Sequence, residues 1–225
     1  MSNPLAIVAG AGAGLGQTLV RSLGENGYNA IGLNRTVPDG ANAATLAVDL
    51  AEVDQTARAV SGLISSHGAP KLVVHNTAKL VISGFEGAAN ADFEVTWRAM
   101  VLSAVNLARG VLPAMVENGG GTFIVTGATA SLRGGAKFAA FATAKAGLRA
   151  LTQSLAREYG PKGVHVAHVI LDGIVDTDAS RTLHSIDPAR MMKPDDIAQT
   201  YLALADQPKS TWTHELDLRP MGETF

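Results

Sequence analysis

The residues best suited to hold a charged ligand lie close to the amino terminus. Residues 9–16 read AGAGAGLG, between an apolar run and a segment with helical periodicity. In such a turn one glycine makes the tight bend, one lets a pyrophosphate approach the backbone, and one lets the helix pack closely on the strand. The phosphates would meet free N–H groups and the positive end of the helix dipole. A glycine run alone also fits a flexible turn, but its strand–turn–helix context favours a dinucleotide site at Gly10, Gly14, Leu15 and Gly16.

The residues after the next two apolar runs would meet the adenosine half of such a dinucleotide. Arg35 follows the second run, where an NAD site would want an acidic residue for the ribose 2′-hydroxyl. A guanidinium fork can donate two hydrogen bonds to a 2′-phosphate, so Arg35 predicts NADP(H) as the preferred cofactor, with NAD(H) as the alternative. The competing interpretation is a solvated surface arginine. Asp49, just after the third run, could accept from the adenine amino group or cap the helix that begins nearby.

Apolar runs and helix-period segments alternate along the chain. We predict strands over residues 5–9, 29–33, 45–48, 71–75, 122–126, 164–171 and 215–218, and helices near 15–26, 53–67, 91–118, 138–159 and 194–205. Such alternation builds βαβ units around a parallel sheet. We therefore expect one α/β domain over residues 1–225, a single Rossmann-like doubly wound parallel sheet with helices on both faces. Residues 175–193 show no clear period and follow a strand, where open α/β sheets place their ligand crevice.

The composition favours a globular chain without nucleic-acid, membrane or metal partners. The 225 residues fit one α/β domain, and 47% hydrophobic against 17% charged residues permit a large core. With a net charge of −2, the chain has no excess of basic residues that would attract nucleic acid. The sequence contains no run of about 18 apolar residues, so we expect no membrane span. The absence of cysteine excludes disulfides, a thiolate nucleophile and a cysteine metal site. Since the apolar residues from Leu5 lead into the glycine turn rather than a cleavage site, we expect a cytoplasmic protein.

Several motifs, in this order, resemble those of the short-chain dehydrogenase/reductase family over nearly the full chain. Three of them are Gly10-x-x-x-Gly14-x-Gly16, Val48-Asp49-Leu50 and, at a late helix start, Pro194-Asp195-Asp196-Ile197-Ala198. Two others differ in part: His75-Asn76-Thr77-Ala78 stands where the family usually has Asn-Asn-Ala-Gly. Asp172-Gly173 followed by Thr177 stands where the family has Pro-Gly-x-x-x-Thr. The resemblance implies a nicotinamide-dependent oxidoreductase acting on a small molecule. It also implies cofactor contacts at Leu50, Asn76, Gly173 and Thr177, although the amide of Asn76 could instead satisfy backbone groups between central strands.

The resemblance breaks at the residues that usually perform the chemistry. Family members carry Asn, Ser, Tyr and Lys, the last two spaced Tyr-x-x-x-Lys on one helix face. In this chain residues 141–145 read FATAK, so Lys145 is present and Phe141 stands in place of the tyrosine. Lys145 is therefore expected to bind cofactor hydroxyls, which does not require the tyrosine.

The other two positions also depart from the family. Counting back from Pro113 places Met100 where the asparagine would fall. The serine position falls on Thr129 when the preceding strand is the anchor, and on Ala128 when Phe141 is the anchor. We prefer Thr129, which could hydrogen-bond a substrate oxygen or simply cap a turn.

The missing phenol matters because hydride delivery to a carbonyl develops an alkoxide, which needs a proton. Phenylalanine has no proton to give, and general acid–base catalysis is typically worth about 10²–10⁴-fold. His75, Asp172 and Lys145 are the other conceivable donors, although His75 and Asp172 could be purely structural. Two functions stay open: an atypical NADP(H)-dependent oxidoreductase, and an NADP(H)-binding sensor, scaffold or partner subunit without turnover.

Small residues are concentrated in the predicted helix 138–159, where they permit close approach of another element. They are Ala139, Ala140, Ala142, Ala144, Ala146 and Gly147. The resemblance implies that this helix joins a homodimer or homotetramer interface. The alternative is close packing within the chain itself.

Overall fold

The core of the fold is one parallel sheet, seen in a computed structural model that describes residues 3–37 and 44–223. Its seven strands run in the order β3-β2-β1-β4-β5-β6-β7, and every neighbouring pair is parallel. The strands are β1 Leu5–Ala9, β2 Asn29–Asn34, β3 Thr45–Ala47, β4 Leu72–His75, β5 Gly121–Thr126, β6 Val164–Leu171 and β7 Glu215–Leu218. The predicted fold class is confirmed, because the strand order reverses between β1 and β4 as in a doubly wound sheet.

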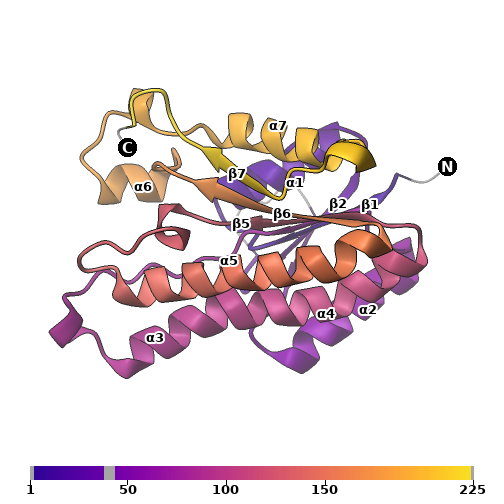
Figure 1. The fold of residues 1–225 in the computed structure, drawn as a ribbon, viewed down its shortest axis with the longest axis horizontal. Coiled ribbons are helices and arrows are strands. Elements are labelled where there is room, and N and C mark those ends of the chain that lie inside the picture. The colour runs from indigo at the N-terminus through magenta and orange to yellow at the C-terminus, as the bar shows by residue number, and fades with distance from the viewer. Residues whose placement is uncertain (1–2, 38–43, 224–225) are drawn as a thin grey trace.

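Helices cover both faces of this sheet (Figure 1). They are α1 Leu15–Glu25, α2 Val53–His67, α3 Asn90–Trp97, α4 Ser103–Glu117, α5 Ala139–Tyr159, α6 Asp178–Leu183 and α7 Pro194–Ala205. Strand β1 alternates between the two cores: Ile7 packs in the core beneath α2, α4 and α5, whereas Val8 packs in the core beneath α1 and α7. A strand buried on both faces explains why its sequence is continuously apolar rather than alternating.

The predicted helix 91–118 is interrupted, which corrects the sequence-based assignment. A π-helical segment, Arg98–Leu102, separates α3 from α4. The carbonyl oxygen of Ala99 within it accepts hydrogen bonds from the hydroxyls of Thr77 (2.6 Å) and Ser103 (2.7 Å). These hydroxyls satisfy a carbonyl oxygen that the wider π-helical turn leaves without its usual backbone partner. Periodicity in the sequence could not reveal the π-helical segment, because Thr77 lies outside this helix.

Two further segments qualify the sequence-based description. Residues 175–193 contain the short helix α6, whose N-cap Thr177 accepts from the backbone N–H of Ser180 at 3.1 Å.

The run Asn90–Glu117 is long and apolar enough to cross a membrane, but 56% of its most apolar window is buried, as in the core helix of a globular fold. In α5, a Cβ added at Gly147 would lie 2.7 Å from the Trp97 ring, so this small residue serves the chain's own packing. Assembly through α5 stays a prediction.

Candidate functional site

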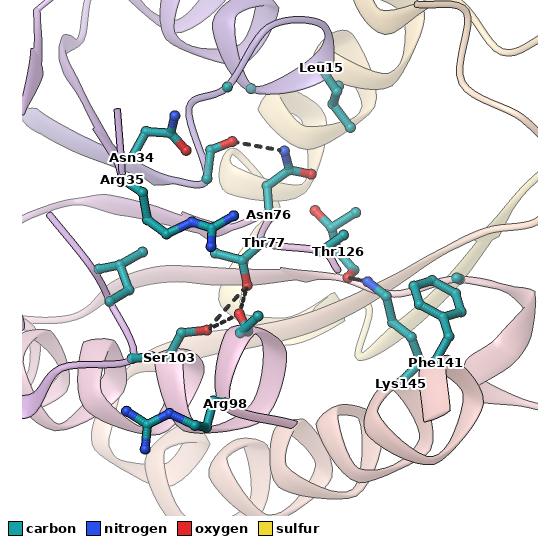
Figure 2. Close-up of a pocket in the computed structure, with 18 of the residues that line it drawn as sticks. Leu15, Asn34, Arg35, Asn76, Thr77, Arg98, Ser103, Thr126, Phe141 and Lys145 are labelled. Atoms are coloured by element: carbon teal, nitrogen blue, oxygen red, sulfur yellow. Dashed lines mark hydrogen bonds between the residues drawn. The ribbon is translucent and has the colours of Figure 1, made fainter. Parts of the chain in front are cut away.

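A cavity of about 770 Å³ opens at the carboxyl ends of the central strands (Figure 2). Its volume lies within the range of sites that bury a small molecule or cofactor. It is bounded by the glycine turn, the segments after β2, β3 and β4, and the start of α5. Of the residues predicted to bind a cofactor, only Gly14 is absent from the cavity lining. The lining contains all the others: Gly10, Leu15, Gly16, Arg35, Asp49, Leu50, Asn76, Lys145, Gly173 and Thr177.

The glycine turn forms a tight cradle at the start of α1. Gly14 has a φ of +94°, and a Cβ there would lie 2.6 Å from the Thr177 methyl group. At Gly16 a Cβ would lie 2.2 Å from the carbonyl oxygen of Gly10, so the helix can approach the strand only without a side chain. Helix α1 has no side-chain N-cap hydrogen bond and no acidic residue in its first turn. The N–H of Gln17 already donates to the carbonyl oxygen of Gly12 at 3.1 Å. The arrangement therefore fits an anion that would accept from the N–H groups of Leu15 and Gly16.

The far end of the cavity presents two arginines to the adenosine half of a dinucleotide. Arg35 is exposed just beyond β2 and reaches into the cavity in Figure 2. Asp49 also lines the cavity, and its Oδ1 accepts from the N–H of Ala51 at 3.0 Å in the loop before α2. The N-cap residue of α2 is Glu52, and the helix has no side-chain cap hydrogen bond, so Asp49 does not cap it. Sequence reasoning missed the pair of Arg98 and Glu52, which line the same end with an N–O separation of 2.7 Å.

At the opposite end, Lys145 and Phe141 lie one helical turn apart on α5 and both line the cavity. The Lys145 ammonium donates to the carbonyl oxygen of Thr126 at 2.8 Å and lies 5.7 Å from the centre of the Phe141 ring (Figure 2). Lys145 is only 3% exposed, and this burial lowers its pKa to about 8. The predicted juxtaposition of lysine and aromatic ring on one helix face is therefore present, with the ring carrying no hydroxyl.

The two remaining family positions contribute no acid to the cavity. Met100 is fully buried in the π-helical segment and lies outside the cavity lining. Ala128 lines the cavity, whereas Thr129 does not, and the Thr129 hydroxyl donates to the carboxylate of Asp172. Asp172 also pairs with Arg219 at 2.9 Å. A substrate contact by Thr129 thus stays a prediction, and the cavity wall itself carries the alanine.

A buried hydroxyl–imidazole network that sequence reasoning missed lies behind the cavity. The Nε2 atom of His75 lies 2.8 Å from the Ser103 hydroxyl and 3.0 Å from the Thr77 hydroxyl, and both hydroxyls line the cavity. Both hydroxyls also donate to the carbonyl oxygen of Ala99, which matches the His75 tautomer that carries its proton on Nε2. Burial and the nearby Lys145 charge lower the pKa of His75 to about 3. The only sequence signal was the histidine in place of the family's first asparagine.

Known proteins share this architecture along the whole chain. Residues 4–187 match the sequence model of short chain dehydrogenases. An uncharacterized oxidoreductase of Staphylococcus aureus is 23% identical over 98% of this chain and 99% of its own length. The structure of a short-chain dehydrogenase from Rhodopseudomonas palustris superimposes with a TM-score of 0.82 at 29% identity, covering 98% of this chain and 100% of that one. A metagenomic short-chain oxidoreductase in complex with NADP gives a TM-score of 0.82 at 27% identity, covering 98% of both chains.

Proposed function

Because this chain belongs to the short-chain dehydrogenase family, we propose that it is an atypical NADP(H)-dependent oxidoreductase in which Lys145 takes the place of the usual phenol as proton source. Its substrate is a small molecule that meets the cofactor at the Phe141 end of the cavity. The observation that carries the proposal is the pairing on one face of α5 of a buried lysine with a phenylalanine, both lining the cavity.

The chain's residues suit an NADP-type cofactor. The uncapped first turn of α1 and its glycine cradle fit the pyrophosphate, Arg35 fits a 2′-phosphate, and Lys145 fits ribose hydroxyls. The neighbour in complex with NADP supports a pyridine nucleotide in this fold. When bound, the cofactor would supply or accept a hydride; the protein must orient the substrate and manage its proton.

Of the three conceivable donors, Lys145 is the one that the geometry favours. His75 lies behind the cavity wall, and with a pKa of about 3 it is already the neutral imidazole at physiological pH. Asp172 lies outside the cavity lining and is held by Thr129 and Arg219. Lys145 reaches the cavity. Its pKa of about 8 keeps the amine protonated at pH 7, and because this pKa is close to the operating pH, Nζ can also release its proton.

A second candidate function is binding of NADP(H) without turnover, as a sensor, scaffold or partner subunit. It is favoured by Phe141 and Met100, neither of which offers a proton where the resemblance places the family's tyrosine and asparagine. It is also favoured by the cavity wall, which carries Ala128 rather than Thr129. A binder and a slow enzyme would share the same cofactor cradle, so the cradle does not discriminate between them.

The decisive variant is Lys145→Met, which keeps most of the stem but removes the charge. We expect wild-type NADPH oxidation with aldehydes or ketones to fall as pH rises through about 8, and the variant to lose about 10²-fold or more. Single-turnover absorbance over pH about 6–9 measures both, and Lys79→Met, an exposed lysine outside the cavity lining, is the control.

The outcomes separate the two candidates. A Lys145→Met protein that binds NADPH and oxidises it at the wild-type rate contradicts the proposed role of Lys145. Wild-type binding of NADPH with no oxidation across the whole panel favours the non-catalytic function instead.

A further inference from the structure

One wall of the cavity is a face of α3 that continues into the π-helical segment. Ala91, Glu94, Val95 and Arg98 line the cavity, and their spacing of three and four residues places them on one helix face. All four are exposed. An exposed helix face on a cavity wall is available to contact the ligand that fills the cavity.

Arg98, the cation of this wall, is held in place at both its backbone and its side chain. Its Nη2 atom donates to Oε1 of Glu52 at 2.7 Å, and Glu52 stands at the start of α2. The next residue, Ala99, accepts hydrogen bonds from the hydroxyls of Thr77 and Ser103. The backbone beside Arg98 is therefore tied to the segment after β4, and its guanidinium is tied to α2.

The ion pair of Arg98 and Glu52 separates the cavity from a second hollow. Ala51, Glu52 and Arg98 line both the cavity and this hollow of about 430 Å³. The two paired side chains are 50% and 51% exposed, so their ion pair contributes little to stability. Hydrogen bonds to a guanidinium lie in its plane, so the bond to Glu52 leaves the flat faces of Arg98 available for stacking.

The two arginines at this end of the cavity differ in what surrounds their charges. Among the residues that the structure describes, no carboxylate lies within ion-pair distance of Arg35, whereas Arg98 is paired with Glu52. Glu52 offsets the attraction of Arg98 for a phosphate, so a 2′-phosphate fits Arg35 better. The adenine is attached to the same ribose as that phosphate and therefore lies at the same end. Its π-faces are surfaces on which a guanidinium plane can stack.

We propose that Arg98, oriented by Glu52, stacks on the adenine ring of the cofactor and is the binding residue for the base. The inference rests on the proposed function, in which an NADP-type cofactor fills this cavity. Ala91 and Val95, on the same helix face, supply apolar contact beside the base. Loss of the guanidinium plane should therefore weaken every ligand that carries adenosine, with or without a 2′-phosphate.

Calorimetry with NADP⁺, NAD⁺ and adenosine 2′,5′-bisphosphate tests this assignment. For Arg98→Ala we expect the affinity for all three ligands to fall about three- to thirtyfold, the range of a cation–π contact. Arg98→Lys keeps the charge but not the plane, so it should lose most of the same factor. Arg35→Ala should instead leave NAD⁺ affinity unchanged. Arg109→Ala, at an exposed arginine outside the cavity lining, is the matched control and should bind all three as wild type does.

Wild-type affinity of Arg98→Ala for the bisphosphate would overturn the stacking role. A loss confined to the two ligands with a 2′-phosphate would also overturn it, because Arg98 would then be a phosphate contact. If the variants do not fold, NMR of the wild-type complex with NADP⁺ decides: nuclear Overhauser effects between the adenine H2 or H8 proton and the Arg98 side chain support stacking, and their absence overturns it.

The binding measurements do not require turnover, so they separate this inference from the proposed function. A wild type that binds NADPH but never oxidises it contradicts the proposed function and leaves the comparison at Arg98 valid. A wild type that binds none of the three ligands contradicts both.

Discussion

At the scale of single residues, the site combines features readable from the sequence with contacts that were not. The spacing of Phe141 and Lys145 predicted their shared helix face, and Arg35 was found at the cavity because it follows a strand end. The hydrogen bond between His75 and Ser103 joins residues 28 apart in sequence, and it depends on how α4 docks on β4. No local pattern encodes such docking, so the network behind the cavity became visible only in the fold.

Cofactor choice is tested at Arg35. Loss of one charge-assisted phosphate contact should cost about 1.5–3 kcal/mol, or roughly 10–150-fold in NADPH affinity, for Arg35→Ala. NADH affinity should change little, because NADH has no 2′-phosphate. Fluorescence titration with both cofactors measures the ratio, and Arg109→Ala, which removes an exposed arginine outside the cavity lining, is the control. Equal wild-type affinity for NADPH and NADH would contradict the assignment.

At the scale of elements, the sequence predicted the strands and α7 closely and failed where tertiary contacts override periodicity. Residues 164–171 and 194–205 were assigned with the bounds that the structure has. The prediction of one continuous helix over residues 91–118 was wrong, because the hydroxyls of Thr77 and Ser103 stabilise the π-helical segment at Ala99. Helix α6 was missed because its six residues are too few to show a period.

Two glycines of α1 give a matched test of the cradle. A Cβ at Gly16 would meet the backbone oxygen of Gly10 at 2.2 Å, so Gly16→Ala should cost about 1–3 kcal/mol of unfolding free energy and weaken NADPH binding. Gly24 has nothing within 4 Å of such a Cβ, so Gly24→Ala should stabilise the protein by about 0.5–1 kcal/mol. Urea unfolding of both variants decides, and similar effects at the two positions would contradict the packing described for the turn.

At the scale of the whole molecule, burial of the two histidines beside Lys145 predicts sensitivity to mild acid. Their pKa values, about 3 for His75 and about 4 for His168, lie below the unfolded value of 6.5. The unfolded chain therefore binds more protons below pH 6.5, so stability is fully present above that pH and is lost as pH falls. The two together should lower the unfolding free energy by about 4 kcal/mol between about pH 7 and pH 5.

Urea unfolding at a series of pH values checks this loss. His168→Asn should remove about half of the pH dependence, since one of the two groups no longer titrates. A wild-type unfolding free energy that is flat across this range would contradict the buried, neutral state of the pair.

The claim that the absent phenol limits the chemistry is tested most directly by restoring it. Phe141→Tyr places a hydroxyl one turn before Lys145, on a ring whose centre lies 5.7 Å from Nζ. Single-turnover NADPH oxidation with aldehydes and ketones should be slow in wild type and faster in the variant. The gain should stay below the full ~10²–10⁴-fold of a positioned acid, because Ala128 and Met100 leave the rest of the family's site incomplete. Fast wild-type turnover that the substitution leaves unchanged would contradict the account.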